Sequence, residues 1–277
     1  MFAYHFMVNA FRAGTIVAVA GGAIGWFMVL RRQTFAGHTL AVVGFPGAAG
    51  AVWLGSSAAW GYFGFCGFAS LLIAALPHRG GEQRSDESAG IGIIQAFALA
   101  SGYLFVSLYR GFLNGVNALL FGSFLGITDT QVLVLLVVAL AALGALVAGG
   151  RRLLFASIDA DVAAARGVPV RTQSVLFLLL LGLAVAEISQ ITGTLLVFSL
   201  LVMPASTAQS LTARPALSLA LSVMIAIAIT WAAITVAYHS QYPVGFWIAT
   251  FGFACYVGAT AARHWNTRLR GRAPIPT

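Results

Sequence analysis

The stretch TGTLLVFSLLVMPASTA, residues 192–208, is apolar enough to lie in lipid, yet it carries a glycine near its start and a proline followed by small hydroxyl residues near its end. It belongs to a longer apolar segment, 174–211, whose 38 residues would form a straight helix about 57 Å long. The hydrocarbon core of a bilayer is only about 30 Å thick. The chain must therefore break or turn back within this segment, and Gly193 and Pro204 are the expected places.

The composition extends this argument to the whole chain. Of its 277 residues 60% are hydrophobic and only 8% are charged, which sets it apart from ordinary soluble proteins. Apolar runs long enough to cross a membrane as helices recur at 13–30, 37–55, 56–77, 90–108, 131–150, 174–192, 194–211, 216–238 and 244–262. The sequence predicts an all-α polytopic membrane protein with eight or nine transmembrane helices, one span broken near Gly193 and Pro204. Because the polar loops are short, residues 1–277 are expected to form a single transmembrane domain.

All fifteen basic residues are arginines. If the spans alternate through nine crossings, thirteen arginines fall on one side of the membrane and only Arg12 and Arg110 on the other. The positive-inside rule then places the thirteen-arginine side in the cytoplasm, with the N-terminus outside and the C-terminus inside. This topology explains most of the net charge of +8, so nucleic acid is not an expected partner.

No enzymatic motif stands out. A P-loop requires a lysine, and the chain has none. It contains no H-E-x-x-H and no clear G-x-S-x-G, and its seven acidic residues form no obvious acid–base pair. Cys66 and Cys255 lack metal or redox spacing, and Asp129 is expected to cap the helix that follows it. An enzyme is therefore not predicted, although an intramembrane enzyme is an alternative.

The segment RRLLFASIDADVAAARGVPVRTQ, residues 151–173, predicts a short cytoplasmic helix. Asp159 can act as its N-cap, Gly167 suits the left-handed position after its end, and Pro169 prevents its continuation. Two turns of helix are marginal in water without support. The helix is therefore expected to dock on the membrane face of its own protein, on the lipid surface or on a partner subunit.

Three segments carry a resemblance to a known family. NAFRAGTIVAVAGGAIGWFMVLRRQTFAGHTLAVVGFPG (9–47) pairs a first span ending in two arginines with a polar patch and a proline-glycine; ASIDADVAAARGVPV (156–170) contains the short helix; and GTLLVFSLLVMPASTAQSL (193–211) contains the expected break. In this order they resemble the permease subunits of ATP-binding-cassette (ABC) importers for zinc, manganese or iron.

The resemblance implies a function and a set of partners. The chain would be the membrane-spanning subunit of an importer for a divalent metal ion in a bacterial plasma (inner) membrane. Its short helix would insert into a cleft of a cytoplasmic ABC ATPase, which assigns this coupling to Asp159, Asp161, Arg166, Gly167 and Val168. ATP and Mg would be bound by the ATPase subunits, and no cofactor by this chain. An extracytoplasmic metal-binding protein and a second permease, identical or paralogous, would complete the assembly.

The resemblance also marks a departure in the second span. Family members often place an aspartate there and a histidine four residues later, whereas this chain has His38 and Val42. His38 remains a candidate metal ligand, since imidazole suits borderline metals. Glu187 is the one carboxylate inside a long apolar run, where ionisable groups suggest function. The predicted translocation path consists of His38, Glu187, Gln190 and Pro204.

Two other transport functions remain open from the residues. A permease for a chelated metal or a vitamin would share the broad architecture. A secondary carrier driven by an ion gradient could use Glu187 as its proton site, but such carriers usually show paired discontinuous helices in two related halves. This sequence suggests one break and no internal symmetry.

Overall fold

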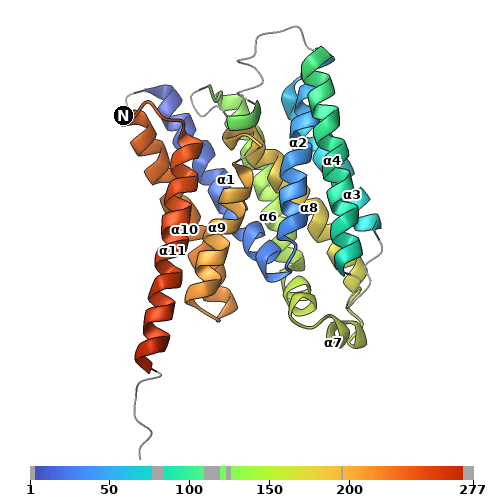
Figure 1. Cartoon of the computed structure of the whole chain (residues 1–277), viewed down its shortest axis with the longest axis vertical. Helices are drawn as coiled ribbons and strands as arrows, with labels where there is room; N and C mark the ends of the chain where they lie inside the picture. The colour runs from blue at the N-terminus through green and yellow to red at the C-terminus, as the bar shows by residue number, and fades with distance from the viewer. Residues whose placement is uncertain (1–3, 77–83, 109–118, 123–125, 195, 271–277) are drawn as a thin grey trace, which may run out of the picture.

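The protein is a helical bundle in which the described residues form no strand (Figure 1). This computed structural model describes residues 4–76, 84–108, 119–122, 126–194 and 196–270. Its principal helices are α1 (His5–Leu30), α2 (Thr34–Trp53), α3 (Ala58–Ala75), α4 (Arg84–Leu108), α6 (Asp129–Ile158), α7 (Ala160–Ala165), α8 (Val170–Thr192), α9 (Val197–Leu211), α10 (Pro215–His239) and α11 (Val244–Arg270). Among the described residues, eight helices, all of these except α7 and α9, are long and apolar enough to cross a membrane. The predicted all-α polytopic fold is confirmed.

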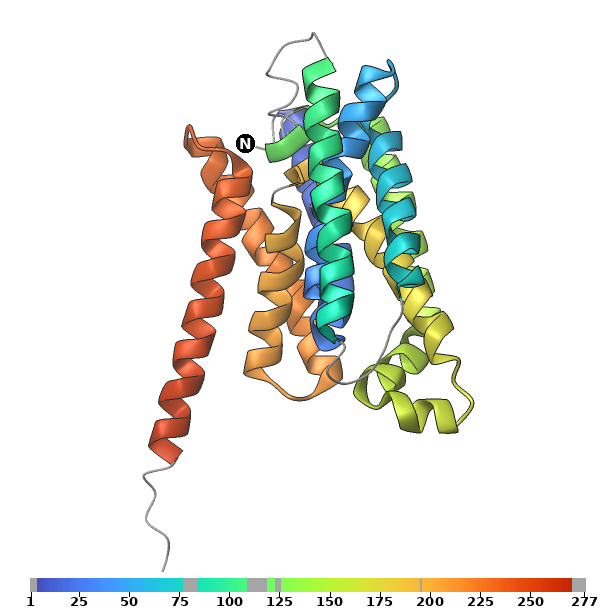
Figure 2. The same ribbon diagram turned by 45° about the vertical axis from the view of Figure 1, so that its right-hand side comes forward.

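The long helices alternate in direction between the two ends of the bundle (Figures 1 and 2). The N-terminal end of α1 lies at one end of the bundle, and α7 and the last turn of α11 point to the other. We call the end that carries α7 the cytoplasmic end, since the arginine distribution assigns it to that side, and the opposite end the outer end. Three arginines adjoin helix termini at the cytoplasmic end. Arg31 follows α1, Arg166 follows α7 and Arg214 precedes α10.

The predicted break falls between α8 and α9. Gly193 ends α8 with a φ of 73°, and α9 begins again at Val197 as a helix of 15 residues, shorter than the eight spans. Pro204 lies inside α9, which continues through it. A proline removes one backbone hydrogen bond, and here the loss does not end the helix.

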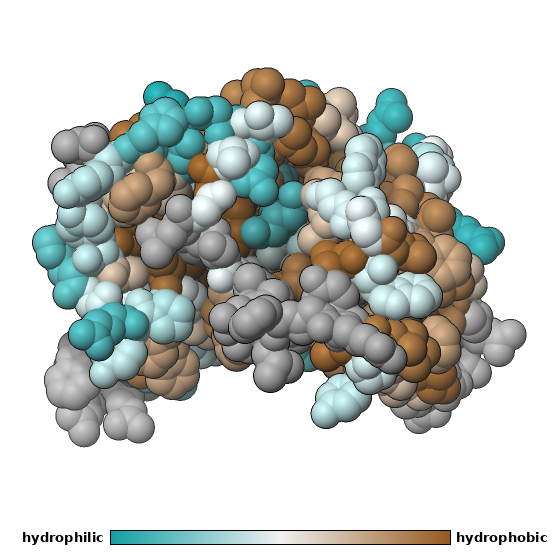
Figure 3. All heavy atoms as spheres, turned by 90° about the horizontal axis from the view of Figure 1, so that it is seen from above, coloured by the Kyte–Doolittle hydropathy of each residue, from teal (hydrophilic) through white to brown (hydrophobic). Residues whose placement is uncertain are grey.

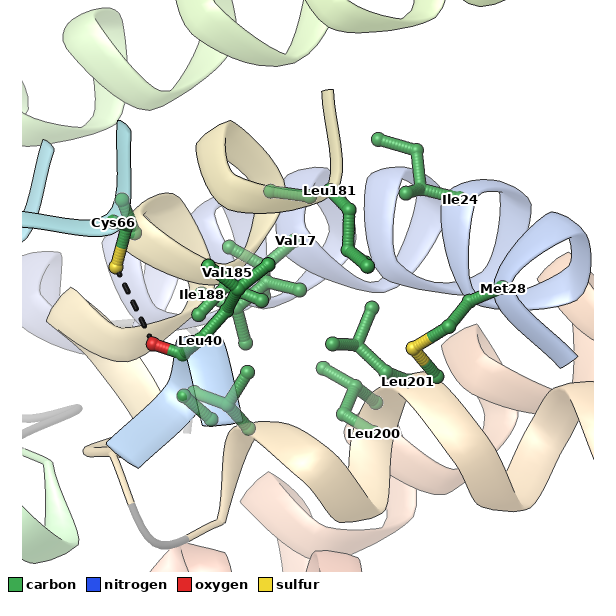
Figure 4. Close-up of a cluster of buried hydrophobic side chains, with 14 of the residues drawn as sticks. Val17, Ile24, Met28, Leu40, Cys66, Leu181, Val185, Ile188, Leu200 and Leu201 are labelled. Carbon is green, nitrogen blue, oxygen red and sulfur yellow. Dashed lines mark hydrogen bonds between the residues drawn. The ribbon is translucent and has the colours of Figure 1, made fainter. Parts of the chain in front are cut away.

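The interior is formed by α1, α2, α3, α8 and α9. Figure 4 shows Val17, Ile24 and Met28 of α1 converging with Leu181 of α8 and Leu201 of α9. The most hydrophobic windows of α1 and α8 are 72% and 67% buried, against 17% for both α4 and α11. The exposed apolar faces of α4 and α11 are therefore the surfaces that lipid or another membrane chain would cover.

Small residues set the distance between neighbouring helices. A β-carbon at Gly47 or Gly61 would collide with the backbone of the other glycine, where α2 crosses α3. A β-carbon at Gly25 of α1 would likewise collide with the carbonyl group of Leu201 in α9. This is the close backbone approach that small residues permit between membrane helices.

One local expectation was wrong by one residue. Thr128, rather than Asp129, is the N-cap of α6: its side chain accepts from the Gln131 amide, and the Gln131 side chain accepts from the Thr128 amide in return. This is a capping box. Asp129 occupies the first turn and instead contacts His5 of α1 at 2.9 Å.

Candidate translocation path and coupling segment

The short helix α7 lies at the cytoplasmic end, between α6 and α8 (Figure 2). The Asp159 carboxylate accepts a hydrogen bond from the Val162 amide at 3.0 Å and caps the helix as the sequence predicts. Gly167 follows with a φ of 80°, and the Val168 amide donates back to the Ala163 carbonyl at 3.0 Å. The helix is thus closed at both ends by local hydrogen bonds.

Most of the predicted coupling residues point away from the bundle. Asp159, Asp161, Arg166 and Gly167 are exposed and Val168 is half-buried. Ala163 is the buried anchor of α7, and the Arg166 guanidinium lies 5.9 Å from the centre of the Phe155 ring. One side of the helix therefore packs on the protein, and the other offers two carboxylates and a guanidinium to a partner.

His38 lies near the start of α2 and faces α9. Its ring meets the Phe198 ring edge-on at 5.0 Å between centroids, and its buried Nδ1 has no hydrogen-bond partner among the described residues. Val42, one turn further along α2, is buried. A second imidazole is therefore missing from the place where the resemblance would put it.

Glu187 lies near the outer end of α8 and is fully buried. Neither carboxyl oxygen has a hydrogen-bond partner within the described part of the chain, an arrangement that is unfavourable in a low-dielectric interior. Gln190, one turn further on, donates to the Ala186 carbonyl at 3.2 Å. Its side chain also lines a cavity of about 110 Å³ together with Gln131 of α6.

The four predicted path residues do not form one cluster of bonded groups. His38 contacts α9, Gln190 bonds within α8, and Pro204 is buried inside α9. Within the described residues, no group of three or more His, Cys, Asp or Glu side chains is placed to hold a metal ion. The roles of these four path residues in translocation stay predictions.

A second pocket opens at the outer end. A pocket of about 680 Å³ lies between the start of α1, residues 121–122 and the turn from α10 to α11, and is lined largely by apolar and aromatic side chains including Phe6, Phe121, Tyr238 and Tyr242. Figure 3 looks onto this end, where hydrophilic and hydrophobic residues lie around a hollow.

Several polar contacts at the cytoplasmic end were not anticipated. Arg31 was expected only to mark the cytoplasmic side, as one of the thirteen arginines, but its guanidinium donates to Ser157 and Ser174 on either side of α7. Only the pair of arginines at the end of the first span could have drawn attention to it. Serines in an apolar sequence do not indicate which cation they will meet.

A bundle of long apolar helices, with one span broken between α8 and α9 and a capped, exposed helix at the cytoplasmic end, is the architecture of a polytopic membrane permease. The sequence pattern of the ABC 3 transport family matches residues 3–263, and the chain belongs to this family. It is thus an ABC transporter permease subunit and a multi-pass protein of the bacterial plasma membrane.

Named relatives and a solved structure agree with this assignment. The chain is 32% identical to the chelated iron transport system membrane protein YfeC of Yersinia pestis, over 99% of this chain and 94% of that protein. It is 29% identical to the manganese transport system membrane protein MntC of Halalkalibacterium halodurans, over 82% and 77% of the two chains. A chain in the structure of PsaBC from Streptococcus pneumoniae in complex with Fab superposes with a TM-score of 0.82 and 25% identity, covering 92% of this chain and 91% of that one.

Proposed function

We propose that this chain is the permease subunit of an importer that moves a divalent metal ion (manganese, iron or zinc) inward at the expense of ATP hydrolysed by a separate subunit. The observation that carries the proposal is the similarity along nearly the whole chain to YfeC, together with the likeness to MntC. The chain supplies a path and a mechanical link, and it performs no chemical step.

The coupling segment is α7 with the residues that close it. Its exposed surface bears Asp159, Asp161 and Arg166 at the cytoplasmic end, where a cytoplasmic ATPase can reach it. The ATPase subunits bind ATP and Mg, and closure of their dimer pushes α7 and the ends of α6 and α8 to which it is joined.

The remaining partners fit the two other free surfaces. A second copy of this permease, or a paralogue, packs through part of the apolar faces that one chain leaves exposed. An extracytoplasmic metal-binding protein delivers the substrate to the outer end, where the pocket beside Tyr238 and Tyr242 opens.

The substrate path in this proposal includes His38, Glu187, Gln190 and Pro204. His38 offers an imidazole to the ion. The carboxyl group of Glu187 offers two oxygens that have no hydrogen-bond partner among the described residues. Pro204 lies in the helix that follows the Gly193 turn, and its missing backbone hydrogen bond would let α9 bend as access alternates.

A chelated metal is the second candidate substrate. Two observations favour it: the partner position of His38 is the aliphatic Val42, and YfeC is named for chelated iron transport. A chelate keeps its own ligands during passage, so it needs fewer from the protein.

Reconstitution tests the proposal. The tagged chain is purified with the ATPase that accompanies it, placed in proteoliposomes with the metal-binding protein outside, and assayed for uptake of radioactive Mn²⁺, Fe²⁺ or Zn²⁺ with and without enclosed ATP. ATP-dependent uptake supports an importer, and supply of the same metal as a chelate separates the two substrate classes. Uptake without any ATPase would instead indicate a gradient-driven carrier.

A double variant at the end of α7 tests the role of this helix in coupling. Gly167→Pro conflicts with the positive φ at this position, since proline fixes φ near −65°, and Arg166→Glu reverses the charge beside it. The double variant is expected to abolish uptake while the spans remain folded. Normal uptake by this variant would exclude α7 as the link.

A further inference from the structure

Arg31 connects the end of α1 to both helices that flank α7. Its Nη1 donates to Ser157 Oγ at 3.1 Å and its Nη2 to Ser174 Oγ at 2.7 Å. Ser157 lies two residues before the Asp159 cap, and Ser174 lies near the start of α8. One guanidinium thus bridges the entry and the exit of the coupling segment.

The bridge is held in a fixed orientation. Arg31 Nε donates to the Gln33 amide oxygen at 3.4 Å, and the guanidinium lies 5.3 Å from the centre of the Phe177 ring. Its planar fork holds two acceptors at fixed positions, a geometry that a lysine ammonium lacks. Burial lowers the pKa of the Arg31 guanidinium, yet arginine side chains stay protonated in proteins.

The same end of α1 is joined to α9 and α10. The Trp26 carbonyl accepts from Gln209 Nε2 of α9 at 2.9 Å, and the Trp26 indole donates to Ser218 Oγ of α10 at 2.9 Å. At Gly25, the preceding residue, the backbones of α1 and α9 lie too close together for a β-carbon. Hydrogen bonds and close backbone packing therefore link this end of α1 to α9.

The α9 helix in turn reaches the predicted path. It begins directly after the Gly193 turn and carries Phe198 against His38. A continuous series of contacts therefore runs from the ends of α6 and α8, through Arg31 and Trp26, to the ring that touches His38.

We propose that Arg31 is a positioning residue for coupling: it transmits the displacement of α7 to α1 and, through Trp26 and Gln209, to α9. This inference rests on the proposed function of α7 as the contact with the ATPase. It adds the residues that carry the movement from the cytoplasmic end into the bundle. Arg31 touches neither the ATP nor the substrate.

The test compares Arg31→Gln with Arg32→Gln in the complete complex of permease, ATPase and metal-binding protein in proteoliposomes. Both variants remove one positive charge from the same loop, but Arg32 is exposed and makes no comparable bridge among the described contacts. The quantity measured is the metal taken up per ATP hydrolysed. Arg31→Gln is expected to lower this ratio by about 2- to 30-fold, the range for a residue in a coupling network, whereas Arg32→Gln leaves it unchanged.

Two further measurements distinguish a role of Arg31 in transmitting the movement of α7 from a role in the stability of the complex. The double variant Ser157→Ala/Ser174→Ala leaves Arg31 in place but removes both acceptors; it should lower the ratio similarly, and adding Arg31→Gln should have little further effect. The melting temperature and ATPase content of each purified complex are recorded, so that a loss of folding is recognised. A normal uptake ratio in both the Arg31 and the double-serine variants would overturn the inference.

Failure of the inference is distinguishable from failure of the proposed function. If the unmodified complex shows no ATP-dependent uptake, the proposed function is wrong. If the unmodified complex transports, the α7 variant does not, and Arg31→Gln transports normally, then only the route through Arg31 is excluded.

Discussion

Gly193 and Gly122 meet backbone to backbone at the outer end of the bundle, and neither position has room for a β-carbon. A β-carbon on Gly193 would collide with the Gly122 amide and the Leu120 carbonyl oxygen, and one on Gly122 with the Ile191 carbonyl oxygen. The Leu119 carbonyl also accepts from the Thr194 amide at 3.2 Å and from the Tyr62 hydroxyl at 3.0 Å. The break in the span is therefore a tightly packed turn.

Gly193→Ala is expected to destabilise the protein. The glycine has φ 73° and ψ 159°, a region that other residues enter only at a penalty of about 1–3 kcal/mol, and the collision with residues 120 and 122 adds to it. The measurement is the thermal midpoint of the purified protein in detergent. Gly144→Ala is the control, because a β-carbon there meets nothing within 4 Å. Equal midpoints for the two variants would contradict the packing described for the turn.

Glu187→Leu is expected to raise stability and lower transport. The substitution removes a buried carboxyl group whose oxygens have no partner among the described residues, and an unsatisfied buried group destabilises by about 1–3 kcal/mol. Uptake should nevertheless fall if Glu187 belongs to the path. Gln190→Leu is the matched control, since Gln190 already donates to the Ala186 carbonyl and its loss should bring no gain in stability. A stabilised Glu187→Leu protein with full uptake would remove Glu187 from the path.

The sequence was sufficient to predict features that depend on composition or on local backbone rules. The apolar runs located the spans, and Asp159 and Gly167 delimited α7, because caps and left-handed positions are set by neighbouring residues. The glycine at 193 was recognised as a break because the 174–211 stretch is too long for one crossing. Pro204 was grouped with it, although α9 continues through this residue.

Features that depend on which helices become neighbours were not predicted. Arg31 is separated from Ser157 and Ser174 by more than a hundred residues, and no periodicity in the sequence links them. The contact of His38 with Phe198 and the isolation of Glu187 depend in the same way on the tertiary packing of α2, α8 and α9. The pairing of His5 with Asp129 likewise gave the first turn of α6 a partner that its own sequence does not specify.

Asp159→Ala is expected to weaken the association with the ATPase. Loss of an N-cap side chain destabilises a helix by about 0.5–2 kcal/mol, and a helix of six residues has little else to hold it. The measurement is the amount of ATPase recovered with the tagged permease. Asp159→Asn keeps a capping side chain and should retain most of the ATPase. Asp161→Ala removes an exposed carboxylate without removing the cap, so a loss equal to that of Asp159→Ala would indicate charge, rather than helix formation, as the cause.

Val42→His tests whether His38 handles the metal. Residues 38 and 42 lie one turn apart on the same face of α2, so the substitution places two imidazoles where both can bind one borderline ion. Uptake of Zn²⁺ at limiting concentration should change by about tenfold or more, which corresponds to roughly 1.4 kcal/mol of added binding free energy. Uptake rises if binding of the ion to the path limits the transport rate, and it falls if release of the ion limits it. Val43→His, on a different face of α2 and also buried, is the control for the disturbance of packing and should give no metal-dependent change. His38→Ala should reduce the uptake of the bare ion more than that of its chelate; if it reduces neither, and Val42→His behaves as Val43→His does, His38 does not line the path.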